Sequence, residues 1–255
     1  MRRQAGAPCR CRRGGRCGIL FEGIDVSLTE EGAGEPLVFL HGWGACKECF
    51  YYQTAYFCRY YRVIAFDFPN FGKSGAAPAA WGVGEYAAFT SRLLRARGVC
   101  GARLCAHSFG GRVALKLLAE EPDLFSKALL TGCAGVPPRR GLRYKCRVRA
   151  YRIAKKLAPR FAERNFGSEE YKKLSPVMRE SYKKIVNEDL TPCLARIRVP
   201  VLYVFGKRDA ATPPYMAEIL YKNTPQAGLV WLGGTHFCFS EQPAAFNAAA
   251  REFFR

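Results

Sequence analysis

The sequence of 255 residues predicts an α/β fold with a mainly parallel sheet covered by helices on both faces. Short apolar runs rich in β-branched and aromatic residues recur along the chain, and helix-like segments lie between most of them. The hydrophobic fraction of 49% is enough for a packed interior. No apolar run approaches the roughly 20 residues that span a bilayer. We therefore expect one large domain without a transmembrane segment.

The expected strands are six apolar runs bounded by Gly, Pro or Asp, at residues 37–40, 62–66, 102–106, 128–131, 201–205 and 229–232. Before them, residues 19–29 have the pattern of two antiparallel strands that turn at Glu22-Gly23. Such a pair is expected at the edge of the sheet. The alternation stops between 135 and 199, where no strand is expected. Two helical patterns, at 142–161 and 176–187, indicate that helices are inserted between two strands.

The net charge of +19 is concentrated in two segments. Residues 1–18 contain six Arg and no acidic residue, and residues 139–198 contain 18 Lys or Arg against 6 Asp or Glu. The rest of the chain is nearly neutral, with 16 basic and 15 acidic residues. Because no nucleic-acid motif accompanies these charges, nucleic acid is not an expected partner. The basic insertion is either a solvated helix face or a surface that attracts an acidic carrier protein or anionic substrate.

The N-terminal segment and the cysteines favour a cytoplasmic protein. Residues 1–18 lack the apolar stretch of a secretory signal peptide, and we expect a disordered Arg/Cys-rich tail there. Most of the 12 cysteines, such as Cys105 and Cys133, have apolar neighbours, and we interpret them as reduced, buried thiols. Residues 46–49, Cys-Lys-Glu-Cys, have the spacing of half a zinc site. A second Cys/His pair is missing, so no metal is expected.

Ser108 lies in the sequence Ala-His-Ser-Phe-Gly-Gly at residues 106–111, after a predicted strand and before a helix-like run. In this context small-x-Ser-x-Gly is typical of a nucleophile elbow. The tight turn strains the backbone of the serine, and small neighbours let strand and helix approach closely. The backbone N–H of Phe109, at the helix start, then faces a developing oxyanion. Taken alone, the motif is equally compatible with an ordinary turn.

Three further segments follow predicted strands and would supply the partners of such a serine. His-Gly-Trp-Gly at residues 41–44 lets the backbone turn sharply and presents the N–H of Trp43 as a second oxyanion donor. Asp209 lies just beyond a strand, and His236 lies in the loop after the last strand. A base must remove the serine proton, and a carboxylate must fix the tautomer of that base. We therefore predict Ser108 as nucleophile, His236 as general base and Asp209 as its orienting acid.

Residues 19–255 resemble the α/β-hydrolase family, and in particular its carboxylesterases, haloperoxidase-like enzymes and carbon–carbon hydrolases. The matching stretches are residues 41–44, 67–74 (Asp-Phe-Pro-Asn-Phe-Gly-Lys-Ser), 106–111, 206–213 (Gly-Lys-Arg-Asp-Ala-Ala-Thr-Pro) and 235–237 (Thr-His-Phe). The resemblance implies an α/β-hydrolase fold in which the insertion at about 135–199 is a helical cap. Two residues depart from the family pattern without removing a catalytic atom: Asn70 replaces a glycine, and Thr235 replaces a glycine or alanine.

The resemblance implies a Ser108–Asp209–His236 triad, with the amides of Trp43 and Phe109 as the oxyanion hole. The expected reaction is hydrolysis of a carboxylic ester or thioester through an acyl-enzyme, without a cofactor. The His-Gly-Trp-Gly form is similar to that of carboxylesterases acting on pimeloyl-acyl-carrier-protein methyl ester.

Two kinds of alternative stay open. Cleavage of a carbon–carbon bond, lactone or amide, or perhydrolysis, would use the same triad, because cap and pocket select the substrate. The second alternative is that the chain is a non-catalytic protein that binds a ligand in the same fold. We interpret His107 and His41, next to these motifs, as structural.

Overall fold

The computed structural model describes residues 17–139, 141, 146, 149 and 169–255. The chain forms two compact units. The larger takes in Met1–Pro78, Val83–Val136 and Asp189–Arg255, and the smaller takes in Ala79–Gly82 and Pro137–Glu188. The smaller unit is thus narrower than the expected insertion at 135–199, and it includes four residues from an earlier part of the chain.

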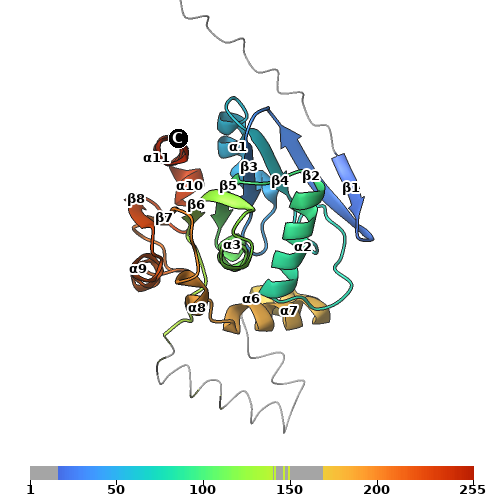
Figure 1. The fold of residues 1–255 in the computed structure, drawn as a ribbon. Coiled ribbons are helices and arrows are strands. Elements are labelled where there is room, and N and C mark those ends of the chain that lie inside the picture. The colour runs from blue at the N-terminus through green and yellow to red at the C-terminus, as the bar shows by residue number, and fades with distance from the viewer. Residues whose placement is uncertain (1–16, 140, 142–145, 147–148, 150–168) are drawn as a thin grey trace, which may run out of the picture. The chain divides into compact units, whose positions relative to one another are not determined.

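An eight-stranded sheet forms the centre of the larger unit. The strands are β1 (Cys17–Phe21), β2 (Ile24–Glu31), β3 (Pro36–Leu40), β4 (Arg62–Phe66), β5 (Ala102–His107), β6 (Phe125–Thr131), β7 (Val201–Gly206) and β8 (Ala227–Leu232). Their order across the sheet is β1-β2-β4-β3-β5-β6-β7-β8 (Figure 1). β2 pairs antiparallel with β1 and with β4, and all other neighbours are parallel. The predicted fold class and all the predicted strands are confirmed.

The first two strands form a hairpin at the edge of the sheet, as predicted. Its turn residues Glu22 and Gly23 have φ of 50° and 77°, the left-handed conformation that two-residue hairpin turns require. The hairpin begins earlier than expected, because Cys17 already pairs with Leu28. The expectation of a disordered tail at 1–18 was therefore wrong for its last two residues. Residues 1–16 lie outside the described part of the chain.

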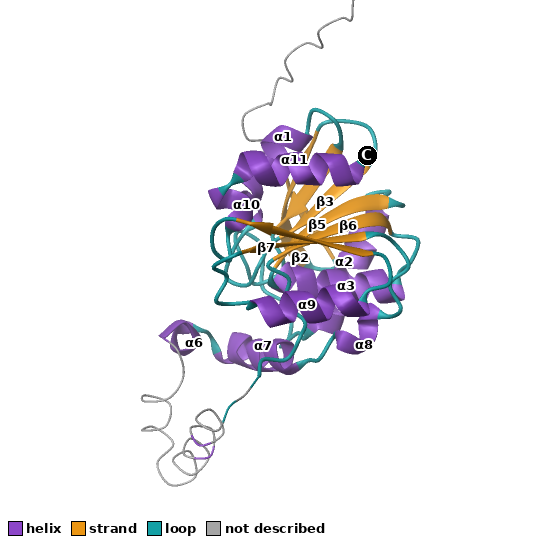
Figure 2. Ribbon diagram, turned by 90° about the vertical axis from the view of Figure 1, so that its left-hand side faces the viewer, coloured by secondary structure: helices purple, strands orange, loops and turns teal. Residues whose placement is uncertain are grey.

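Helices cover both faces of the sheet in the larger unit (Figure 2). They are η1 (Lys47–Phe50), α1 (Tyr51–Phe57), α2 (Val83–Ala96), α3 (Phe109–Glu120), α8 (Thr191–Leu194), α9 (Pro214–Asn223), α10 (Cys238–Glu241) and α11 (Pro243–Phe254). On one face, Leu37 and Phe39 of β3 join a buried cluster with Phe246 and Phe254 of α11. Coverage on both faces explains why the strands are continuously apolar rather than alternating.

In the smaller unit the structure describes α6 (Glu169–Lys173) and α7 (Pro176–Asn187). The predicted helix at 176–187 is confirmed. Ser175 caps it, because its side chain accepts a hydrogen bond from the N–H of Met178 (3.2 Å), and proline at the first helical position suits the helix start. The described residues between 137 and 188 include no strand. The predicted helix at 142–161 lies outside the described residues, apart from residues 146 and 149, which are helical.

Nine cysteines have side chains that the structure describes, and all nine are free thiols. Five are buried (Cys58, Cys105, Cys133, Cys193 and Cys238), Cys46 and Cys49 are partly buried, and Cys100 and Cys146 are exposed. The prediction of buried thiols is therefore confirmed for Cys105 and Cys133, whereas Cys100 and Cys146 are among the exposed minority. Among the described helices, none is long and apolar enough to cross a membrane.

Candidate active site

Ser108 occupies a strained turn between β5 and α3. Its φ of 52° and ψ of −108° lie outside the regions that residues with a side chain favour, and the surrounding structure holds it there. The Ser108 N–H donates to the carbonyl of Thr131 at the end of β6 (3.1 Å). A methyl group on Gly110 would lie 2.3 Å from the carbonyl oxygen of Leu40, so glycine is required where α3 crosses β3. This is the geometry expected of a nucleophile elbow.

Asp209 and His236 are brought into contact beyond β7 and β8. Asp209 Oδ2 lies 2.8 Å from His236 Nδ1 and also accepts the hydroxyl of Thr212 (2.7 Å). Asp209 Oδ1 accepts the N–H groups of Ala211 (2.9 Å) and Thr212 (2.8 Å). Burial opposes ionisation of Asp209, but the hydrogen bonds from His236 and Thr212 outweigh it and lower its pKa. An ionised carboxylate here places the imidazole proton on Nδ1 and leaves Nε2 as an acceptor.

The chain at the end of β6, which accepts a hydrogen bond from the Ser108 N–H, also lies next to His236. Gly132 follows Thr131, the acceptor of the Ser108 N–H, and has a φ of 50°. A methyl group at Gly132 would come within 3.0 Å of Cε1 and Nδ1 of His236. The ring of His107, which precedes Ser108, packs against the same imidazole in a tilted arrangement, with 4.7 Å between ring centroids. Ser108, Asp209 and His236, the three predicted triad residues, therefore follow β5, β7 and β8 at the same edge of the parallel sheet.

His107 is buried and lies beside His236 rather than facing solvent. It is 2% exposed, and its Nε2–H donates to the carbonyl oxygen of His236 (3.0 Å). Its Nδ1 is among the buried polar atoms for which the described residues provide no hydrogen-bond partner. Burial, reinforced by the neighbouring His236, lowers the pKa of His107 to about 3. His107 thus stays neutral at physiological pH.

The His-Gly-Trp-Gly loop lies beside the elbow. His41 is fully buried, its Nδ1–H donates to the carbonyl of Gly42 (2.8 Å), and its Nε2 accepts the N–H of Phe68 (3.0 Å). Burial lowers the pKa of His41, so its ring is neutral and can make both bonds. A methyl group on Gly42 would lie 3.4 Å from the Cβ of Ser108. The backbone that leads to Trp43 is therefore next to the elbow serine.

The two predicted oxyanion donors come from adjoining segments. Trp43 follows Gly42, and its ring packs edge-on against that of Phe109, with 5.7 Å between centroids. Both rings also contact Phe71. Phe109 is the first residue of α3, where the helix leaves its N–H groups without intrahelical acceptors. This packing holds the two peptide segments in a fixed relation.

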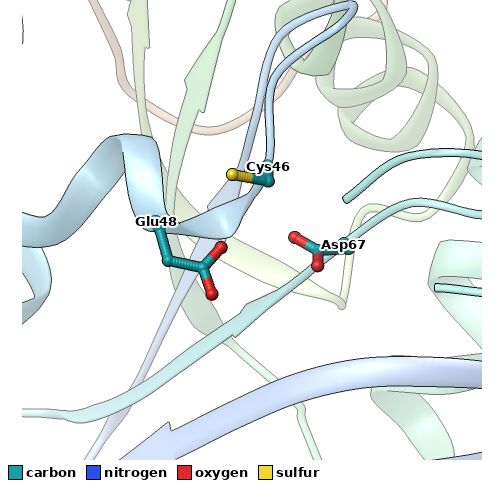
Figure 3. Close-up of side chains that lie close together, drawn as sticks. All are labelled: Cys46, Glu48 and Asp67. Atoms are coloured by element: carbon teal, nitrogen blue, oxygen red, sulfur yellow. The ribbon is translucent and has the colours of Figure 1, made fainter. Parts of the chain in front are cut away.

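Cys46, Glu48 and Asp67 point toward one another, with potential ligand atoms within 4.8 Å (Figure 3). The Nζ of Lys47, which is 9% exposed, contacts Glu48 (3.1 Å) and Asp67 (3.4 Å) and donates to Ser27 (2.7 Å). Its backbone N–H also donates to Asp67 (2.7 Å). Burial and the neighbouring Glu48 raise the pKa of the Cys46 thiol, which weakens it as a ligand. The Lys47 ammonium already supplies a positive charge to the carboxylates of Glu48 and Asp67, where a metal ion would otherwise do so. We therefore interpret this cluster as an ion-pair network.

Sequence reasoning missed the role of Asp67 in this network. Its carboxylate accepts the N–H of Lys73 (2.9 Å), and its carbonyl accepts the hydroxyl of Ser74 (2.6 Å). Asp67 thereby joins the loop after β4 to Lys47, just beyond the His-Gly-Trp-Gly loop. The signal that could have found it was an aspartate directly after a buried strand.

The departure at Asn70 has a clear structural reason. Its φ of 73° is the left-handed conformation, which glycine adopts without cost and asparagine tolerates better than most residues. The Asn70 side chain also accepts the N–H of Ala77 (3.0 Å) and contacts the hydroxyl of Tyr86 (3.4 Å). Asparagine therefore replaces glycine here by adding hydrogen bonds across its own loop.

Comparison with known proteins identifies the family to which this fold belongs. Residues 37–249 match the model of the alpha/beta hydrolase family, and the chain belongs to that family. It is 26% identical to 3-oxoadipate enol-lactonase 2 of Acinetobacter baylyi over 246 residues, which cover 88% of this chain and 92% of the lactonase.

Two further proteins are similar to this chain over different shares of its length. The chain is 33% identical to (E)-2-((N-methylformamido)methylene)succinate hydrolase of Acinetobacter baylyi, but over only 104 residues, 40% of either protein. The structure of the esterase EaEST from Exiguobacterium antarcticum superposes with a TM-score of 0.73 and 26% identity, covering 91% of this chain and 96% of the esterase. These relatives are hydrolases with different substrates.

Proposed function

We propose that this chain is a serine hydrolase that cleaves a carboxylic ester or thioester through an acyl-enzyme. The observation that carries the proposal is the strained Ser108 at the start of α3, at the same edge of the sheet as a His236 whose Nδ1 lies 2.8 Å from Asp209 Oδ2. The relatives named as an esterase and an enol-lactonase support this choice, since a lactone is a cyclic ester.

In the proposed first half-reaction, Ser108 Oγ attacks the carbonyl carbon while its proton moves to His236 Nε2. The amides of Trp43 and Phe109 donate to the oxygen that becomes negative. The tetrahedral intermediate then collapses, and the alcohol or thiol leaves with the proton from His236. An ester bond now joins the acyl group to Ser108.

In the second half-reaction a water molecule attacks the acyl-enzyme and passes a proton to His236. Collapse returns that proton to Ser108 and releases the carboxylic acid. Asp209 keeps the imidazole in the required tautomer and stabilises its transient positive charge in both halves. No step needs a metal or an organic cofactor.

The decisive test is covalent labelling of Ser108 with an alkyl fluorophosphonate, together with hydrolysis of p-nitrophenyl esters of graded acyl length. We expect one adduct, found by mass spectrometry on the peptide that contains Ser108, and none in Ser108→Ala. In Asp209→Asn we expect kcat to fall by about 10³–10⁴-fold with KM little changed, because the amide no longer holds the required tautomer. Circular dichroism should show that both variants are folded.

A folded wild-type protein that takes up no label and hydrolyses no ester would overturn the proposal in favour of a non-catalytic ligand-binding protein. Labelling of Ser108 with no ester hydrolysis would instead favour another bond for the same triad. Carbon–carbon, amide and lactone substrates, and peracid formation with hydrogen peroxide, are then the assays that discriminate.

A further inference from the structure

Thr235, the second departure from the family pattern, is bound by a carboxylate at both of its donors. Its backbone N–H donates to Glu241 Oε2 (2.6 Å) and its hydroxyl donates to Glu241 Oε1 (2.6 Å). Hydrogen bonds to an ionised acceptor are shorter and about twice as strong as neutral ones. One carboxylate therefore holds the residue that immediately precedes His236.

The carbonyl group of Thr235 is also fixed by its neighbours. Thr235 O accepts the N–H of Cys238 (3.2 Å) and lies so close to Gly206 that a methyl group there would come within 2.0 Å. On the other side of the base, His107 donates to the carbonyl of His236 (3.0 Å). The backbone is thus anchored before and after His236, and Glu241 supplies the only carboxylate among these described anchors.

Glu241 is itself placed by the short helix that follows the base. It is the last residue of α10, and its N–H donates to the carbonyl of Phe237 (2.9 Å). Gly234 has a φ of 101°, and a methyl group there would lie 2.2 Å from Glu241 Oε2. The two hydrogen bonds from Thr235 lower the pKa of Glu241, and the charge of Arg208 adds to the effect. The Glu241 carboxylate is therefore ionised when it accepts the two hydrogen bonds from Thr235.

We propose that Glu241 is a positioning residue that sets the backbone of His236, so that its imidazole meets both Asp209 and Ser108. The inference rests on the proposed hydrolase function. Its physical basis is that a displacement of about 1 Å at a catalytic group can cost about 100-fold in rate. The imidazole is attached to the very peptide that Glu241 and His107 hold, so a looser loop moves the base directly.

The test compares Glu241→Gln, Thr235→Val and Thr235→Ser in the full chain. Glutamine offers only one acceptor oxygen, valine removes the hydroxyl at nearly constant shape, and serine retains both donors. We expect about 10-fold or greater losses in kcat for p-nitrophenyl acetate and in the rate of fluorophosphonate labelling for the glutamine variant. The valine variant should lose less, the serine variant should match wild type, and KM should change little.

The matched control is Glu252→Gln, which changes an exposed carboxylate on α11 that pairs with Arg255. It should leave both rates unchanged. Thermal unfolding and circular dichroism of all four variants show whether any loss comes from unfolding. Equal rates for wild type and folded Glu241→Gln would overturn the positioning role.

A measurement that does not depend on enzyme activity tests this inference separately from the proposed function. Deuterium exchange of the backbone amides at residues 233–238 should be faster in Glu241→Gln than in wild type, and unchanged in Glu252→Gln. If wild type neither labels nor hydrolyses, the proposed function fails, and unchanged exchange in Glu241→Gln would additionally show that the carboxylate does not hold the loop. If wild type is active, faster exchange with a slower reaction supports Glu241.

Discussion

Two of the three histidines in this chain are buried and neutral, and they hold the backbone around the proposed site. His41 bridges Gly42 and Phe68, and His107 donates to the carbonyl of His236. A neutral imidazole is required in each case, because the bond pattern of His41 needs one donor and one acceptor nitrogen. Single residues next to the proposed site therefore act by fixing peptide positions.

The neutral state of His107 makes the stability of the protein depend on pH. In the folded protein its pKa is about 3, whereas an unfolded histidine binds a proton near pH 6.5. As pH falls below about 6.5 the unfolded state takes up a proton first, so stability declines until the folded pKa is reached. Between pH 7 and pH 5 one such group costs about 2 kcal/mol.

His107→Gln tests this, because its amide can donate to His236 O but does not titrate. We expect the variant to be less stable than wild type at pH 7, since glutamine fits the aromatic site poorly. Its unfolding free energy should fall less between pH 7 and pH 5, by about 2 kcal/mol. Urea unfolding at the two pH values gives both quantities. An identical decline in the two proteins would contradict a buried neutral His107.

At the scale of elements, the nucleophile elbow depends on how closely α3 approaches β3. Gly110 faces the carbonyl of Leu40, and Gly111 faces Cys133, whose Sγ would lie 2.7 Å from an added methyl group. These contacts let the first turn of α3 pass over the strand ends. The same closeness fixes Phe109, the proposed oxyanion donor, relative to the His-Gly-Trp-Gly loop.

A pair of glycine substitutions measures this closeness. Gly110→Ala should destabilise the protein by about 1–3 kcal/mol, because a methyl group would overlap the backbone of β3. Gly84→Ala in the first turn of α2 meets nothing within 4 Å and should be neutral or stabilise by up to about 1 kcal/mol. Chemical denaturation of both variants gives the difference. Equal effects would mean that α3 can shift away from β3 without cost.

At the scale of the whole molecule, the charge is strongly asymmetric along the chain. The excess lies in residues 1–18 and 139–198, and the remainder is nearly neutral. A net charge of +19 produces a positive potential that attracts anionic substrates and acidic proteins, and salt screens it.

This charge predicts a salt effect that depends on substrate charge. Between 20 and 500 mM NaCl, kcat/KM for an anionic ester such as mono-p-nitrophenyl succinate should fall about 10-fold. The neutral p-nitrophenyl butyrate serves as control and should change little. Binding of an acidic acyl carrier protein, measured by calorimetry, should weaken over the same range. Salt-insensitive kinetics for both esters, with no carrier-protein binding, would exclude an electrostatic role for the two basic segments, 1–18 and 139–198.

Much of the fold was predictable because its signals are local. Continuous apolar strands, the Glu22-Gly23 turn and the capped helix at 176–187 each follow from a few neighbouring residues. The start of β1 at Cys17 was missed because it depends on pairing with Leu28 rather than on its own side chains. The exposure of Cys100 was likewise decided by where its segment lies in the fold.

The sequence by itself determined the order of Ser108, Asp209 and His236 along the chain, each just past a strand. Tertiary structure decided which distant atoms meet, such as His236 Nδ1 and Asp209 Oδ2 at 2.8 Å, and the Lys47 ammonium and Asp67 at 3.4 Å. The physical reason is that a motif reports the backbone turn that its own residues require. Hydrogen bonds between distant strands depend on the register and twist of the whole sheet, which no short segment encodes.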